Sequence, residues 1–193
     1  MGPTPPLVLA SRSAQRRAIL ERLGVAFEVR ATGVAERDRG DPHDVAVENA
    51  LRKARAAARD CANEMVLGVD TLVALDGVIF GKPENQAAAR STLRALSGAA
   101  HRVVSGLALV DRRGTATATA VTRVSFRELD ETILQWYLAT GEWRGRAGAY
   151  AIQGAGAALV RAIEGDYENV VGLPLATLLD MLPQLLWKGT AAT

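Results

Sequence analysis

The chain has 193 residues, of which 49% are hydrophobic and 23% are charged. It is long enough to form one hydrophobic core, but its length does not favour two independent domains. Its 23 basic and 21 acidic residues are scattered, which disfavours a stable complex with nucleic acid. Cys61 is the only cysteine, which excludes an intrachain disulfide and a cysteine-based zinc site. We expect one cytoplasmic domain over 1–193, with loose ends at 1–6 and 188–193 and no membrane-spanning segment.

The first half of the chain alternates short strands with helices. Ser13 caps one predicted helix and Gly24 ends it, and Asp41 with Pro42 begins another. Strands are expected at 7–10, 25–29, 66–69 (continued by 72–75) and 78–80, and helices at 14–23 and from 42 to about Asp60.

The second half is dominated by a long hairpin. Asp130 caps a helix that Gly141 closes, and the last helix follows Pro174 and runs to about Leu186. Further elements are a helix at 85–96, strands at 101–110 and 115–126, and a strand-like stretch at 148–163 that Gly154 and Gly156 break. Helices that alternate with strands and are followed by antiparallel hairpins predict an α/β or α+β protein with a mixed sheet.

A first candidate site is LASRSAQRR, where a strand leads into a capped helix. The free N–H groups and the positive end of such a helix bind phosphate readily. Ser11 and Ser13 add hydroxyl groups, and Arg16 or Arg17 adds a guanidinium group. The alternative is a capped surface helix with solvated arginines.

A second candidate is Asp70, which lies within the apolar stretch VLGVDTLVAL. Burying a bare carboxylate is costly, so an aspartate in such a stretch indicates a partner or a metal. At a strand end beside a cleft, Asp70 would suit a hard cation such as Mg²⁺ or the activation of a water molecule. The alternative is an aspartate that ends a strand in a turn.

Two weaker candidates follow along the chain. Lys82 stands between Gly81 and Pro83, which hold it in a defined position where its charge suits a phosphate. Gln153, in IQGAG, offers a donor and an acceptor that could read the edge of a base. A solvated lysine and an ordinary glycine-rich turn are the alternatives.

Several stretches follow one another in the order of a known family. They are LASRSAQRRAILERLGVAFEV, Lys53-Ala54, GVDTLVALDGVIFGKP, LRALSGAAHRVVSGLAL, VSFREL, GEWRGRAGAYAIQGAG and IEGDYENVVGLPL. Together they extend from about Leu7 to Leu182, and they resemble the Maf family of nucleoside triphosphate pyrophosphatases.

The resemblance implies a two-lobed α/β fold in which helices flank a mixed sheet around a deep central cleft, similar to inosine triphosphate pyrophosphatases. It also implies hydrolysis of a nucleoside triphosphate to the monophosphate and pyrophosphate with a divalent cation, Mg²⁺ or Mn²⁺. Asp70 would be the general base on the attacking water, and Glu36 and Asp70 would hold the metal. The residues that would contact the phosphates are Ser11, Arg16, Lys53 and Lys82.

Three residues bear on the choice of base. Thr71 and Gln153 resemble the branch of the family that prefers dTTP and UTP, whereas Gln15 replaces an arginine that is typical of that branch. The resemblance further implies a homodimer, for which Trp136 or Trp187 could anchor the interface.

A non-enzymatic function is the main alternative. The family is associated with septum formation, so the chain could be a nucleotide-binding regulator of cell division that does not turn over its ligand. The retained Asp70, Lys82 and Glu36 argue against this alternative, because a protein that only binds a nucleotide does not need a metal-activated water.

Overall fold

The computed structural model describes residues 6–58 and 63–189, without the side chains of 187–189. In this part of the chain, seven strands form one mixed sheet in the order β2-β1-β3-β5-β6-β7, with β4 paired to β3. The pairs β1–β2 and β1–β3 are parallel, and the remaining pairs are antiparallel. The strands are β1 (Leu7–Leu9), β2 (Phe27–Val29), β3 (Met65–Leu75), β4 (Val78–Phe80), β5 (Ala100–Asp111), β6 (Gly114–Phe126) and β7 (Val160–Glu164).

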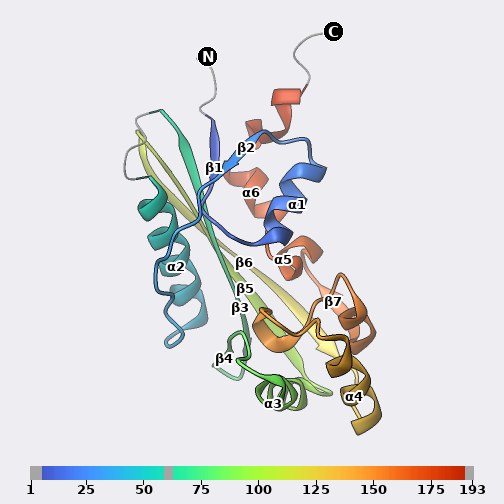
Figure 1. Ribbon diagram of the computed structural model, residues 1–193. Helices are drawn as coiled ribbons and strands as arrows, with labels where there is room; N and C mark the ends of the chain where they lie inside the picture. The colour runs from blue at the N-terminus through green and yellow to red at the C-terminus, as the bar shows by residue number, and fades with distance from the viewer. Residues whose placement is uncertain (1–5, 59–62, 190–193) are drawn as a thin grey trace.

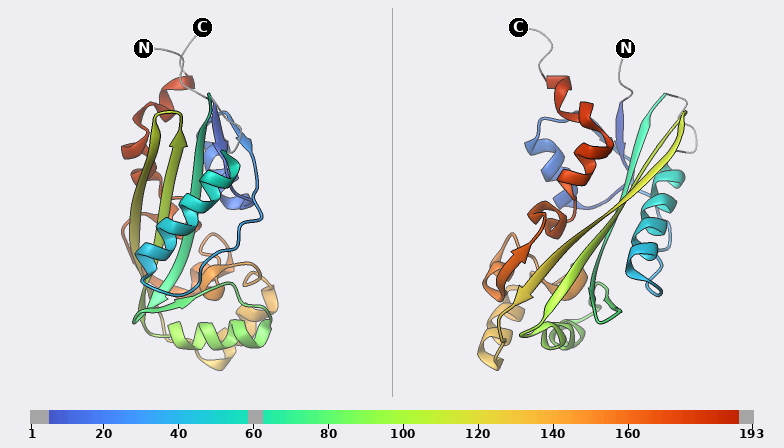
Figure 2. Two further views of the ribbon diagram at one scale, coloured as in Figure 1. Left: turned by 90° about the vertical axis from the view of Figure 1, so that its left-hand side faces the viewer. Right: turned by 180° about the vertical axis from the view of Figure 1, so that it is seen from behind.

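Helices cover both faces of this sheet. Helix α2 packs on β3 and β5, and α1, α5 and α6 lie on the opposite side of the sheet (Figures 1 and 2). Helices α3 and α4 lie at one end of the long strands, away from β1 (Figures 1 and 2). None of the described helices is long and apolar enough to cross a membrane. The α-helices are α1 (Ala14–Arg22), α2 (Pro42–Ala57), α3 (Gln86–Leu96), α4 (Glu131–Thr140), α5 (Tyr167–Val171) and α6 (Leu175–Met181), and the 3₁₀ helices are η1 (Ala147–Ala149), η2 (Ala155–Leu159) and η3 (Pro183–Gly189).

Two large clusters of buried side chains give the molecule its two lobes. One cluster joins β1, α1 and α6 and includes Leu9, Leu20 and Leu178. The other joins α3, α4 and the segment after α4, and it includes Leu93 and Tyr137. The predicted α/β class, with a mixed sheet flanked by helices in two lobes, is therefore confirmed.

Helix α2 approaches the sheet unusually closely, because glycines lie beneath it. A Cβ atom added to Gly106 would lie 2.3 Å from the carbonyl group of Ala46, and one added to Gly68 would lie 2.1 Å from the carbonyl oxygen of Ala50. Both distances are shorter than any tolerable contact, so only glycine fits. The close packing brings the polar side chains of α2 within reach of β3.

Several sequence-based boundaries are wrong. The stretch at 148–163, expected to be strand-like with breaks at Gly154 and Gly156, consists of η1, η2 and only a short strand, β7. Left-handed backbone at Gly148 (φ 68°) and Ala149 (φ 61°) explains this, because a strand requires extended residues. The last helix stops at Met181, near Pro183, and a 3₁₀ helix follows it. Helix α2 ends at Ala57, and Asp60 lies outside the described residues, as does Cys61.

Asp70 lies inside an apolar strand, not in a turn that ends one, which was the alternative interpretation. The strand predicted at 66–69 and continued at 72–75 is β3, and Asp70 lies in its middle. The alternating pattern of β3 explains how a carboxylate fits there. Val69 packs on the α1 and α6 side of the sheet, whereas Asp70 points to the side that α2 covers, where polar partners meet it.

A buried histidine makes the stability of this fold sensitive to acid. His101 is fully buried between Phe126 and Tyr150, and burial lowers its pKa from 6.5 to about 4. Between these two pH values, His101 is protonated in the unfolded chain but neutral in the folded protein. The free energy of unfolding therefore falls as the pH drops from 6.5 to 4. The expected loss is about 3 kcal/mol.

Urea unfolding at several pH values between 7 and 4 measures this loss. His101→Phe keeps an aromatic ring at the site and removes the titrating group, so the extra loss of stability should disappear in the variant. Equal pH dependence in the two proteins would contradict the assignment.

Candidate active site

The candidate site lies where one edge of β3 is left open. On that edge β1 pairs with 65–67 and β4 pairs with 73–75, while β5 covers the opposite edge. No described strand pairs with 68–72 on this edge, and a cleft of about 770 Å³ opens beside it. The cleft is lined by all nine predicted site residues, which are Ser11, Gln15, Arg16, Glu36, Lys53, Asp70, Thr71, Lys82 and Gln153.

Both carboxylate oxygens of Asp70 are held by helix α2. Lys53 Nζ lies 2.6 Å from Oδ1, and Asn49 Nδ2 donates a hydrogen bond of 2.9 Å to Oδ2. Asn49 and Lys53 are four residues apart, so they lie on the same face of the helix. Asp70 is only 5% exposed, and these two partners compensate the burial of its charge.

A second carboxylate meets the same lysine. Glu36 Oε1 lies 2.6 Å from Lys53 Nζ, so one ammonium group joins Glu36 and Asp70. Burial raises the pKa of Glu36, but the hydrogen bond and charge of Lys53, with the charges of Lys82 and Arg16, outweigh it and leave the pKa below its usual value. Glu36 is therefore ionised at neutral pH. Lys53 is engaged by these carboxylates, whereas the resemblance places it on the phosphates.

Arg16 is buried at the opposite wall of the cleft. Its Nε donates to the carbonyl oxygen of Gly172 at 2.7 Å, and its two terminal nitrogens donate to Ser11 Oγ and Thr71 Oγ1, each at 3.0 Å. Burial lowers the pKa of Arg16, while Asp70 and Glu36 act in the opposite direction. A guanidinium group has five N–H donors, so two remain after these bonds. Arg16 thus has a fixed orientation and spare donors for an anion.

The remaining predicted residues line the mouth of the cleft. Lys82 follows β4 and is exposed, as is Gln153, which lies just before η2. Gln15 Oε1 accepts a hydrogen bond of 3.2 Å from Ser13 Oγ, within the first turn of α1. Ser13 Oγ also accepts from the N–H of Arg16, as the predicted cap of this helix requires.

Sequence reasoning missed two polar residues of the site. Asn49 contacts Asp70, and Ser105 Oγ lies 2.8 Å from Thr71 Oγ1. Asn49 could have been found, because it lies four residues before Lys53 on a helix face that otherwise carries Val45, Ala46 and Ala50. Ser105 could not, since its contact depends on the pairing of β3 with β5.

The acidic residues of the cleft fit a divalent cation that a substrate helps to hold. No group of three or more histidine, cysteine, aspartate or glutamate side chains in the described part of the chain could hold a metal alone. Asp70 and Glu36 nevertheless lie close enough to share one cation, since each has a carboxylate oxygen 2.6 Å from the ammonium nitrogen of Lys53. Mg²⁺ prefers oxygen ligands and is commonly bound by one or two carboxylates together with water and substrate phosphates. Two hard oxygen donors meet that requirement.

A mixed α/β protein whose cleft combines two carboxylates with several cationic side chains is suited to an anionic substrate. The chain belongs to the Maf family: the family model described as Maf-like protein matches residues 6–185. Named relatives cover nearly all of it. A dTTP/UTP pyrophosphatase of Moorella thermoacetica is 48% identical over an alignment of 180 residues that covers 91% of this chain and 93% of that protein. One of Pelotomaculum thermopropionicum is 44% identical over 180 residues, 91% of this chain and 94% of that protein.

One solved structure with some similarity is a more distant match. The Staphylococcus aureus Ham1 protein is 16% identical to this chain, with a TM-score of 0.46 over 63% of this chain and 71% of that one. At this level we infer neither fold nor function from the similarity.

Proposed function

We propose that the protein is a nucleoside triphosphate pyrophosphatase that hydrolyses dTTP, UTP or a related nucleotide to the monophosphate and pyrophosphate. The observation that carries this proposal is that the carboxylates of Asp70 and Glu36 both contact the ammonium group of Lys53, beside the unpaired edge of β3. The relatives named dTTP/UTP pyrophosphatase, which match nearly the whole chain, support the same reaction.

The chemistry assigned to the cleft is attack by water on a phosphoanhydride bond. Asp70 accepts a proton from the water as its oxygen bonds to phosphorus, and pyrophosphate leaves with the electrons of the broken P–O bond. Mg²⁺ or Mn²⁺, held by Asp70 and Glu36, would neutralise charge on the phosphate oxygens. Lys82 and the spare donors of Arg16 stabilise the same charge, which is the main requirement of phosphoryl transfer.

Base recognition is assigned to the mouth of the cleft. Gln153 is exposed there and has a donor and an acceptor for the edge of a base. Thr71 is fixed through its hydroxyl group by Arg16 and Ser105, so it shapes the cleft floor. Gln15 is the third residue assigned to specificity, and within the described residues its side chain is hydrogen-bonded to Ser13 alone.

A nucleotide panel tests the function. Purified protein with Mg²⁺ or Mn²⁺ is expected to release pyrophosphate from dTTP or UTP faster than from purine nucleotides, and chelation of the metal is expected to stop the release.

The same panel on Gln15→Arg decides whether Gln15 affects base choice. An unchanged ranking of the nucleotides would exclude Gln15 as a determinant of specificity. Binding of a nucleotide without turnover by the wild-type protein would favour the regulator of cell division instead.

The partner and location remain predictions. The homodimer rests on the family resemblance, and Trp136, 48% exposed on α4, is available to contact a second copy. The side chain of Trp187 lies outside the described part of the structure. A cytoplasmic location, with a nucleotide as the only required partner, is part of the proposal.

A further inference from the structure

One buried amide connects the two carboxylates of the cleft through the backbone. Asn49 is 1% exposed, and its side chain makes three hydrogen bonds. Its Oδ1 accepts from the N–H of Arg37 at 2.8 Å, and its Nδ2 donates to the carbonyl oxygen of Arg37 and to Asp70 Oδ2, each at 2.9 Å. Every polar hydrogen of this amide, and its oxygen, therefore has a partner.

These three partners also fix the orientation of the amide. The carbonyl oxygen of Arg37 and the carboxylate of Asp70 only accept hydrogen bonds at these positions, and the N–H of Arg37 only donates. Exchanging the oxygen and nitrogen of Asn49 would break all three bonds. The arrangement resembles the pairing of two strands, with the side chain of Asn49 in place of a second backbone.

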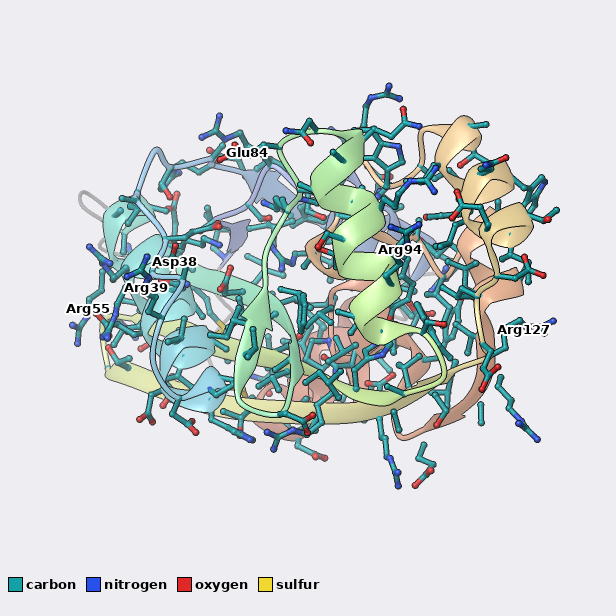
Figure 3. The ribbon with its side chains drawn as sticks, turned by 90° about the horizontal axis from the view of Figure 1, so that it is seen from below. Asp38, Arg39, Arg55, Glu84, Arg94 and Arg127 are labelled. Carbon is teal, nitrogen blue, oxygen red and sulfur yellow. The ribbon has the colours of Figure 1, made fainter. Side chains whose placement is uncertain are left out.

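Residue 37 directly follows Glu36, so this pairing positions the second carboxylate. Glu36 lies on the long connection between β2 and α2, which has no strand or helix of its own among the described residues. Figure 3 shows Asp38 and Arg39, from the same connection, beside α2. The other side-chain link from Arg37 to the helix is an exposed ion pair with Glu48. Such pairs contribute little to stability, so the buried attachments of this connection to α2 are Asn49 and the contact of Lys53 with Glu36 itself.

We propose that Asn49 is the positioning residue of the active site, because it holds Asp70 and the segment that carries Glu36 at a fixed separation. The proposal rests on the function proposed above. Asn49 would not touch the substrate. It sets the place of both carboxylates before a nucleotide or metal arrives, so that neither must be ordered during the reaction.

Asn49→Leu tests the proposal, because leucine has a similar size and makes none of the three bonds. The kcat is expected to fall about 10- to 100-fold, while the KM changes less than about threefold. Hydrogen exchange at the amide of Arg37 should accelerate about tenfold, because its acceptor is lost. Glu48→Gln is the matched control: it removes the exposed link to Arg37 and should leave kcat unchanged.

A folded Asn49→Leu variant with wild-type kcat, or with unchanged exchange at Arg37, would overturn the proposal. Should the variant not fold, Asn49→Asp serves instead. Its carboxylate still accepts from the N–H of Arg37 but cannot donate to Asp70, so exchange at Arg37 should stay slow while kcat falls, and a full kcat would contradict the proposal. If the wild-type protein turned over no nucleotide, the exchange measurement would still test the attachment of Arg37 separately.

Discussion

Asp70→Asn is expected to reduce the kcat for pyrophosphate release by about 10²- to 10⁴-fold, which is the range for loss of a general base. The substitution keeps the shape of the side chain and removes its charge. It also places an NH₂ group against Lys53 Nζ or Asn49 Nδ2, both of which donate to Asp70 in the wild-type protein. A modest loss of thermal stability should therefore accompany the loss of activity, and pyrophosphate release under saturating dTTP measures the main effect.

Asp76→Asn provides the matched control for that substitution. Asp76 is exposed in the turn between β3 and β4, with a left-handed backbone (φ 50°) that asparagine adopts as readily as aspartate. Its activity should equal that of the wild type. An Asp70→Asn variant that is folded and keeps more than about a tenth of the wild-type kcat would remove Asp70 from the role of base.

Gly106→Ala is expected to lower the free energy of unfolding by about 3 kcal/mol or more, the upper range for overpacking a core. The added methyl group would lie 2.3 Å from the backbone of Ala46 and 2.5 Å from the backbone nitrogen of Val47, so helix α2 must move away from the sheet. Because α2 carries Asn49 and Lys53, the same movement should lower activity in the fraction that remains folded. Urea unfolding and kcat together measure both effects.

Gly33→Ala is the control for this prediction. Apart from Gly33 and its two chain neighbours, no described atom lies within 4 Å of the position that the Cβ would take, so the stability of this variant should stay within about 0.5 kcal/mol of the wild type. A Gly106→Ala protein as stable as the Gly33→Ala protein would show that α2 does not need its close contact with β5.

Much of the fold could be predicted from local signals in the sequence. Ser13, Asp41 and Asp130 cap their helices as expected, because an N-cap depends only on neighbouring N–H groups. The turn at Asp76-Gly77 joins β3 to β4 for a similar reason. Where the signal was local, prediction and structure agree.

The elements that were missed depend on contacts across the chain. Residues 148–159 are largely apolar, which is typical of a buried strand, yet left-handed backbone at Ala149 turns the segment. Helix α5 is not predicted by the sequence, since it is only five residues long and lies against α1, where Glu168 contacts Arg22. Such short elements have little helical preference of their own.

The candidate site shows the same division. The nine residues chosen from the sequence line one cleft, although they come from segments between residues 11 and 153. Their contacts could not be predicted. Lys53 contacts both Asp70 and Glu36 because of how α2 packs on the sheet. Arg16 is buried against Gly172, which directly follows α5, because of how that part of the chain packs.

The most direct test of the proposed function is the identity of the products. Wild-type protein incubated with dTTP and Mg²⁺, and followed by ³¹P NMR, is expected to form dTMP and pyrophosphate in equal amounts, and to form neither when the metal is chelated. Formation of dTDP and inorganic phosphate, or binding of dTTP with no product, would contradict the assignment of the Asp70 cleft to pyrophosphate release.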